Sequence, residues 1–331
     1  MSKLFLSNSQ VDTFTTCNRK WWLDKREKIR PTYKATALHF GSSIDEAVET
    51  ILLKPEEDYR AAYLNALANF EVNGKAKTVK DDLLDIKFFA SDLDHKLIVD
   101  DYLERFNAAV SQLDLEPLDV KDYIEYCKQQ RRSKTALTDV EQTIFNTIGI
   151  LSLEHKGLLI IEKLKEWLDA NVARVISVQK KIQISNANGD SFIGYLDFIV
   201  ELKDGRIVLI DLKTSSNPKL YYPPESASES RQLGIYSQEE GVTDVAYLVA
   251  DKVIRVREPR VRLSFVEGTI TEEHLDDVFE EIEEVTNEIK EKLPYGIAAF
   301  EKNLDSCMNF GGCQYRDYCS KGCSKGLEYV K

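Results

Sequence analysis

Two aspartates interrupt segments that are otherwise apolar and rich in β-branched residues. Asp197 follows Gly194-Tyr195-Leu196, and Asp211 stands in Ile210-Asp211-Leu212-Lys213-Thr214. A buried carboxylate is costly unless it is paired or bound to a cation. A surface hairpin with a simple Asp–Lys ion pair is the alternative, but it fits poorly with the apolar neighbours Ile193, Ile199, Ile207 and Leu209. The two aspartates are therefore candidate functional groups.

The turn between the two strands decides whether these carboxylates meet. If the loop is Lys203-Asp204-Gly205, with its glycine in the left-handed conformation, counting outward places Asp197 opposite Asp211. Residues paired in this way share a face of the sheet at about 5 Å. Lys213 points the same way, because it lies two residues beyond Asp211. A two-residue turn would place the aspartates on opposite faces, so the constellation depends on the turn type.

The chemistry expected of such a group is hydrolysis of a phosphodiester. Two carboxylates this close repel each other unless a cation lies between them. Oxygen-rich sites of this kind suit Mg²⁺ or Mn²⁺. The ion would lower the pKa of a bound water and polarise the phosphate. Lys213 would orient that water or balance the charge that builds on phosphorus.

An aspartate on one strand, followed by Asp-x-Lys on the next, resembles the PD-(D/E)XK nuclease motif, here Asp197 with Asp211-Leu212-Lys213. Leu196 stands where the motif usually has proline. The resemblance implies an α/β fold with a restriction-endonuclease-like core, in which a central mixed β-sheet is flanked by helices. A large N-terminal helical region and a Cys-rich C-terminal tail would be added to this core.

Two further segments resemble the RecB-like exonuclease branch of that superfamily. Gln232-Leu233-Gly234-Ile235-Tyr236 matches a Gln-x-x-x-Tyr helix whose residues help to position DNA and the active site; a plain amphipathic helix is the alternative. Gly41 to Glu49 matches a Gly-x-x-x-His-x-x-x-Glu helix in which Asp45 replaces the metal-binding histidine. Asp45 is thus a candidate third ligand, or else a charge favoured by the helix dipole. The nearby His39 is expected to be structural or solvated.

The cysteines predict a second site. Cys307, Cys313, Cys319 and Cys323 lie close together near the C-terminus, and the distant Cys17 could complete a set of four with the first three of them. In a cytosolic chain such a cluster is more often a metal site than a disulfide framework. Four thiolates fit either a [4Fe–4S] cluster or Zn²⁺, although the paired Cys-x-x-Cys knuckles typical of zinc do not occur here.

One early cysteine before a basic and aromatic segment, with three late cysteines, resembles the RecB-like and CRISPR-associated exonucleases that carry an iron–sulfur cluster. The resemblance implies a [4Fe–4S] cluster on Cys17, Cys307, Cys313 and Cys319, with Zn²⁺ as the alternative. The first late spacing is five residues rather than the usual two, so Cys323 is a possible substitute ligand. Cys127 is expected to be an ordinary packed residue. Of Trp21 and Trp22, which could stack bases, at least one is expected in the core.

Composition limits the function classes. The 331 residues carry a net charge of −12, which counts against a protein that mainly coats nucleic acid but leaves room for a local basic groove. Residues 19–30, 128–134 and 255–262 are basic and 272–291 acidic; each run alone is more simply a solvated face. No apolar run approaches the roughly 20 residues of a membrane span, and Met1 to Asn8 lacks a signal-peptide pattern. A cytoplasmic location is expected.

The order of the elements also follows from hydrophobic periodicity. Helical spacing prevails from Leu38 to about Ala170, including 58–70 and 94–110. Strands are expected at 175–184, 192–202, 206–213, 244–250 and 253–265, and a helix at 272–291. The predicted organisation is an N-terminal segment with the cluster cysteine (1–37), a helical region with the first active-site helix (38–170), the core sheet with the Gln/Tyr helix (171–270), and a C-terminal helix with the cluster-binding tail (271–331).

The sequence thus predicts a Mg²⁺- or Mn²⁺-dependent deoxyribonuclease. The resemblance implies exonuclease action on single strands or duplex ends, in DNA recombination, repair or phage-type processing, with a helicase or recombination protein as the expected kind of partner. No Gly-x-x-x-x-Gly-Lys loop is present, so any motor would be that partner. Two alternatives are a catalytically inactive nucleic-acid-binding or assembly module on a nuclease scaffold, and a redox protein built around the cluster.

Overall fold

The fold was analysed in a computed structural model, which describes residues 3–32, 35–68, 70–72, 75–77, 139–186, 188–253 and 261–330, with a few single positions between 107 and 129. The described strands are β1 (Phe5–Leu6), β2 (Ile29–Pro31), β3 (Phe70–Val72), β4 (Lys75–Lys77), β5 (Val172–Ser185), β6 (Ser191–Leu202), β7 (Ile207–Ser215), β8 (Asp244–Asp251), β9 (Leu263–Thr269) and β10 (Leu327–Tyr329). The described helices are α1 (Asn8–Thr16), α2 (Asn18–Lys25), α3 (Thr36–Leu53), α4 (Tyr59–Ala68), α8 (Asp139–Asn171), α9 (Pro218–Tyr221), α10 (Arg231–Glu240), α11 (Glu272–Lys292), η2 (Leu293–Ala299), η3 (Asp305–Gly311) and α12 (Arg316–Lys321).

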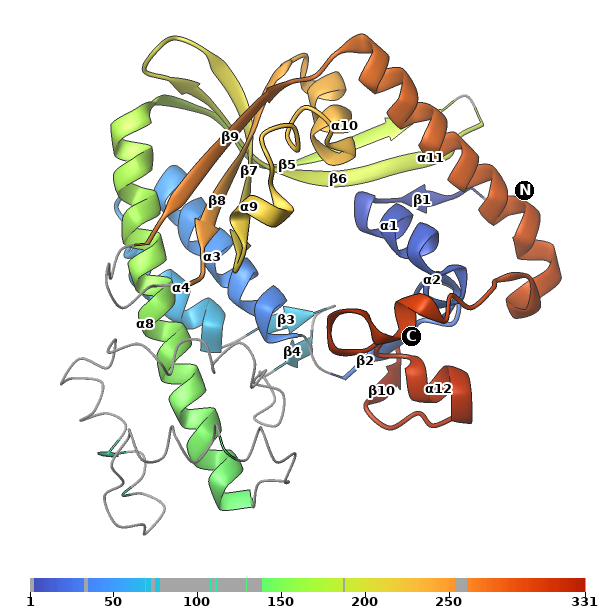
Figure 1. Cartoon of the computed structure of the whole chain (residues 1–331). Helices are drawn as coiled ribbons and strands as arrows, with labels where there is room; N and C mark the ends of the chain where they lie inside the picture. The colour runs from blue at the N-terminus through green and yellow to red at the C-terminus, as the bar shows by residue number, and fades with distance from the viewer. Residues whose placement is uncertain are drawn as a thin grey trace.

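Within these residues, six strands form one mixed sheet in the order β1-β6-β7-β8-β9, and β5 pairs with β6 (Figure 1). The β5–β6, β6–β7 and β8–β9 pairs are antiparallel, whereas β7–β8 and β1–β6 are parallel. Because β5 pairs with β6 along most of its length, β1 and β7 share the other edge of β6, near its two ends. The mixed sheet predicted from the sequence is confirmed.

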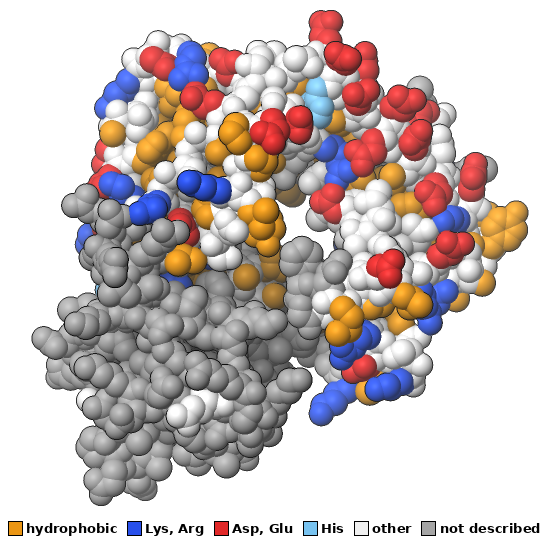
Figure 2. All heavy atoms as spheres, viewed as in Figure 1, with side chains coloured by type: hydrophobic (Ala, Val, Ile, Leu, Met, Phe, Trp, Pro, Cys, Tyr) orange, Lys and Arg blue, Asp and Glu red, His pale blue; other side chains and the backbone are white. Residues whose placement is uncertain are grey.

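Successive strand residues point to opposite faces of the sheet, and helices pack against both faces. Ile210 and Ala246 belong to a core cluster with residues of α3, α4 and α8. Their neighbours Leu209 and Val245 belong to a second cluster with residues of α1, α10 and α11. Helix α11 presents its buried stripe to this second cluster, and Figure 2 shows acidic side chains gathered along its outer side. Strands β7 and β8 are therefore held between two layers of helices.

The N-terminal and C-terminal segments pack against each other (Figure 1). Strand β10 pairs antiparallel with β2, and the hydroxyl of the buried Tyr315 donates to the carbonyl of Ile29 at 2.8 Å. Trp21, which is 2% exposed, stacks on Phe300 at 5.7 Å between ring centroids. The prediction that one tryptophan of the pair packs in the core is confirmed.

Some expected elements differ in the structure. The helix expected at 58–70 ends at Ala68, and Phe70 begins a short β3–β4 hairpin. The strand expected at 253–265 is β9, which begins at Leu263 and ends at Thr269, and residues 254–260 lie outside the described chain. The predicted helix at 94–110 falls largely outside it, and Cys127 falls wholly outside it. Within the described part, every helix is too short or too polar to cross a lipid bilayer.

Candidate active site

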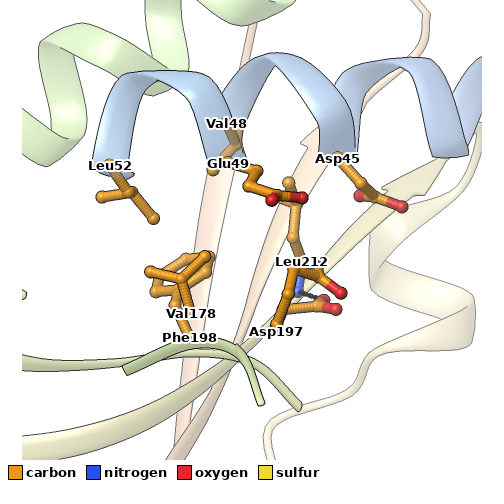
Figure 3. Close-up of a pocket in the computed structure, with 9 residues that line it drawn as sticks. Asp45, Val48, Glu49, Leu52, Val178, Asp197, Phe198 and Leu212 are labelled. Atoms are coloured by element: carbon orange, nitrogen blue, oxygen red, sulfur yellow. Dashed lines mark hydrogen bonds between the residues drawn. The ribbon is translucent and has the colours of Figure 1, made fainter. Parts of the chain in front are cut away.

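The hairpin between β6 and β7 has the three-residue turn. The amide of Leu202 donates to the carbonyl of Arg206 at 2.8 Å, and Gly205 has a left-handed φ of 91°. The ladder continues outward as far as Phe198 opposite Ile210, so the next position places Asp197 opposite Asp211. There the strands part, and the Asp197 carboxylate accepts the amide of Leu212 at 2.8 Å (Figure 3). Where β6 and β7 separate, the Asp197 side chain thus accepts an amide of β7 that a backbone carbonyl of β6 would otherwise accept.

Asp211 and Lys213 form an ion pair beside this opening. The Lys213 ammonium lies 2.5 Å from an oxygen of Asp211, whose side chain is 2% exposed. The other carboxylate oxygen of Asp211 accepts a hydrogen bond from Gln232 Nε2 at 2.9 Å. Both carboxylate oxygens of Asp211 are therefore oriented, one by strand β7 itself and one by helix α10.

The start of α10 places Gln232 against Asp211. Ser230 caps the helix, because its hydroxyl accepts the amide of Leu233 at 3.1 Å. Tyr247 on β8 donates to the same hydroxyl at 2.7 Å and ties the cap to the sheet. One turn later Tyr236 lies on the same helix face, and Gln232 Nε2 is 3.4 Å from its hydroxyl. The Gln-x-x-x-Tyr spacing thus directs both side chains towards Asp211.

Helix α3 supplies the opposite wall. Asp45 and Glu49 line a small pocket together with Asp197 and Leu212, and Figure 3 shows both carboxylates projecting from α3 towards the strand end that carries Asp197. The cavity measures about 10 Å³, the scale of one water molecule. Asp45, Glu49 and Asp197 therefore line a space suited to a small ligand, and Asp211 lies close enough to Asp197 to act on its charge.

The electrostatics of the site follow from this crowding. Burial raises the pKa of Asp197 well above its ordinary value, and the carboxylates of Asp211 and Asp45 raise it further. Burial lowers the pKa of Lys213, but Asp211 and Asp197 outweigh that effect and leave the pKa above its usual range. Burial also raises the pKa of Tyr236 to about 12, so its hydroxyl is neutral at physiological pH. The site concentrates negative charge and holds one fixed ammonium.

Two residues of the pocket were not selected from the sequence. Glu49 lies one turn after Asp45 on α3, and burial, followed by Glu46, raises its pKa; its place in the Gly-x-x-x-Asp-x-x-x-Glu spacing was the available signal. Gln179 lies opposite Asp197 in the β5–β6 register and has a left-handed φ of 48°, which is uncommon for a residue with a side chain. No sequence pattern marks Gln179. His39 is buried and its Nε2 lies 2.6 Å from the Leu67 carbonyl, as expected of a structural histidine.

The chemistry of the donors fits a divalent cation. In the described residues, no group of three or more His, Cys, Asp or Glu has the geometry of a formed metal site. Even so, Asp197 and Asp211 are brought together from two strands, and the crowding with Asp45 makes the ionised form of Asp197 costly. A cation is the usual remedy for carboxylates that converge in a buried place. Hard oxygen donors of this kind suit Mg²⁺ or Mn²⁺.

Most of the predicted cluster cysteines also lie near one another. Cys17, at the junction of α1 and α2, accepts the amide of Asn303 at 3.5 Å, and Cys307 Sγ lies 3.5 Å from the Asn303 carbonyl. Burial raises the pKa of Cys319, and the nearby Cys313 and Cys17 raise it further. Cys323 is exposed. The fold thus brings the early cysteine to the late ones.

The chain matches the family model of the PD-(D/E)XK nuclease superfamily over residues 6–97 and 97–320. A match of this extent, on a mixed sheet with Asp197 and Asp211-x-Lys213 at its mouth, defines a nuclease. The chain belongs to the PD-(D/E)XK nuclease superfamily. No curated protein matches it. One solved structure, titled "Crystal structure of SSO0001", is 14% identical, with 60% of this chain and 93% of that chain covered at a TM-score of 0.27.

Proposed function

We propose that this nuclease is a Mg²⁺- or Mn²⁺-dependent deoxyribonuclease that acts as an exonuclease in DNA recombination, repair or phage-type processing. The observation that carries the proposal is the convergence of Asp197, Asp211 and Lys213 where β6 and β7 part. Asp197 and Asp211 would hold the ion, with Asp45 as a third ligand. The bound ion would lower the pKa of a water ligand and polarise the phosphodiester.

The other residues of the site have separate tasks. Lys213 stays charged because its pKa lies above the usual range, so it can offset the negative charge that grows on the phosphate during hydrolysis. Gln232 fixes the Asp211 carboxylate through its 2.9 Å hydrogen bond. Tyr236 stays neutral and supports Gln232. The net reaction joins a water oxygen to phosphorus and breaks one phosphorus–oxygen bond of the DNA backbone.

We further propose that Cys17, Cys307, Cys313 and Cys319 hold a [4Fe–4S] cluster that fastens the N-terminal segment to the C-terminal tail. The contacts of Asn303 with Cys17 and Cys307, and the proximity of Cys313 and Cys17 to Cys319, support this ligand set. Zinc is the alternative occupant, with Cys323 as a substitute ligand. Iron and zinc analysis of anaerobically purified protein, with absorbance near 400 nm, separates the two metals.

The nuclease proposal is tested with end-labelled linear DNA, single-stranded and double-stranded, in Mn²⁺ or in EDTA. Asp211→Ala should abolish cleavage, whereas Asp204→Ala, a change to the exposed aspartate of the same hairpin, should leave it unchanged. An exonuclease should also spare circular single-stranded DNA of the same composition. Cleavage that survives both EDTA and Asp211→Ala would exclude the mechanism, and cutting of the circle would exclude a strict exonuclease.

A further inference from the structure

A second, larger groove adjoins the active site. It has a volume of about 490 Å³ and is lined by the start of α1, by β1 with the adjoining stretch of β6, and by Gln232 and Tyr236 of α10. Since Gln232 also contacts Asp211, the groove and the catalytic carboxylates share a wall. The catalytic pocket has room for an ion or water, whereas this groove has the size of an organic ligand site.

The lining of the groove combines aromatic rings with neutral polar groups. Phe5 and Tyr195 are 54% and 56% exposed and line the same groove, and apolar side chains that gather on a surface often mark a binding site. Ser7, Asn8, Ser9 and Gln10 add hydroxyl and amide groups. None of the described residues that line the groove is charged, although the chain as a whole carries −12. A polyanion can therefore approach here without meeting a carboxylate of the groove.

The position of Tyr195 relates the groove to the reaction. Tyr195 lies two residues before Asp197 on β6, roughly 7 Å along the strand, and it lines the groove from one face of that strand. Lys181 on β5 is paired directly with Tyr195 and is exposed, which places a cation on that face. Gly194 lets Tyr236 pack closely against β6. The groove thus offers a ring, a cation and hydrogen-bonding groups beside the catalytic aspartates.

We propose that this groove binds unpaired nucleotides of the DNA strand being cut, with bases stacked on Tyr195 and Phe5. This inference rests on the proposed nuclease function and narrows its substrate to single strands or frayed ends. Within a duplex both faces of a base are covered by its neighbours, so an exposed ring can stack on successive bases only when they have left the duplex. The groove therefore selects for unpaired DNA without reading its sequence.

The test measures binding without cleavage. Fluorescence anisotropy in EDTA compares a labelled single-stranded 12-mer of thymidines with a blunt 12-base-pair duplex, for the full chain and its variants. Tyr195→Ala should weaken single-strand binding by about tenfold, the range of one lost base–aromatic stack, and duplex binding by less than about twofold. Tyr195→Phe, which keeps the ring, should bind like the unchanged protein. Tyr295→Ala, which removes a tyrosine that is 76% exposed on η2, is the matched control.

The outcomes separate this inference from the nuclease proposal. If Tyr195→Ala behaves like Tyr295→Ala, or weakens both DNA forms equally, the groove is not a single-strand site, whether or not the protein cuts DNA. If single-strand binding depends on the Tyr195 ring but no variant or metal condition gives cleavage, the groove assignment stands and the nuclease proposal fails. Thermal melts of each variant exclude misfolding as the cause of lost binding.

Discussion

Gly194→Ala tests how closely helix α10 must approach the sheet for the site to form. A Cβ at position 194 would lie 2.5 Å from the Tyr236 hydroxyl oxygen and 2.6 Å from Cε1 of its ring. Ordinary contact begins near 3.4 Å, so the ring must move by roughly 0.8 Å, and Tyr236 is buried in a close-packed core. Overpacking of this kind costs about 1–3 kcal/mol of unfolding free energy.

The same displacement of Tyr236 should also lower the rate of DNA cleavage. Tyr236 contacts Gln232, which orients Asp211, so a shift of this size is expected to slow Mn²⁺-dependent cleavage by about tenfold to a hundredfold. Urea denaturation in EDTA measures the unfolding free energy, and initial rates on end-labelled DNA measure the activity. Gly234→Ala on α10 is the matched control, because its Cβ would meet its nearest atoms at 3.5 Å; it should be neutral or stabilising by up to about 1 kcal/mol.

A double-mutant cycle identifies the contact responsible. In a Tyr236→Ala background the clash is gone, so Gly194→Ala should then change the unfolding free energy by less than about 0.5 kcal/mol. An equal penalty in both backgrounds would show that Tyr236 is not what the new methyl group meets. Normal stability and normal cleavage in the single variant would refute the close approach itself.

Three other predictions follow from charges and thiols described above. Asp197→Asn should raise the unfolding free energy in EDTA at neutral pH by about 0.5–2 kcal/mol while abolishing cleavage, since it removes a carboxylate whose ionisation is costly; a less stable variant would contradict this. Burial raises the pKa of Asp190, but hydrogen bonds from Lys290, the Leu4 amide and Asn186 outweigh this effect and leave the pKa below 3.8. The stabilisation that the ionised Asp190 carboxylate provides is therefore present above pH 3.8 and lost as the pH falls through the folded-state pKa. Asp190→Asn should lower the unfolding free energy by about 1.5–3 kcal/mol at pH 7 and by little in strong acid. Chemical denaturation at each pH measures the difference. Cys17→Ser should lose the bound metal and Cys323→Ser should keep it, as measured by metal content; equal retention in both variants would remove Cys17 from the ligand set.

The register of the β6–β7 hairpin was predictable because the number of residues in its turn determines it. Once Lys203-Asp204-Gly205 is a three-residue loop, the register follows, and Gly205 does adopt the left-handed conformation that such a loop needs. The Gln-x-x-x-Tyr helix was predictable for the same reason, since its spacing fixes which side chains share a face. The roles of these residues in catalysis remain predictions.

The features that were not predicted depend on contacts between distant segments. Strand β1 has two residues, too few for any periodic pattern, and exists because it pairs with residues about 186 positions away. The backbone of Gln179 is left-handed where it lies opposite Asp197, and nothing in the local sequence requires that conformation. Glu49 was visible in the spacing, but its place in the pocket depends on how α3 lies across the strands.

The short strand β1 has a consequence for the solubility of the molecule. Strand β7 pairs with β6 only from Phe198 onward, so β1 covers part of the edge that β7 leaves open, at Ser191 and Phe192. An uncovered edge exposes backbone amides and carbonyls that can pair with another molecule. The segment that begins with β1 also carries Cys17. If disruption of the thiol site released this segment from the sheet, the edge of β6 would become exposed to solvent. Self-association of the protein, detected by light scattering, would then accompany loss of the metal proposed for these thiols.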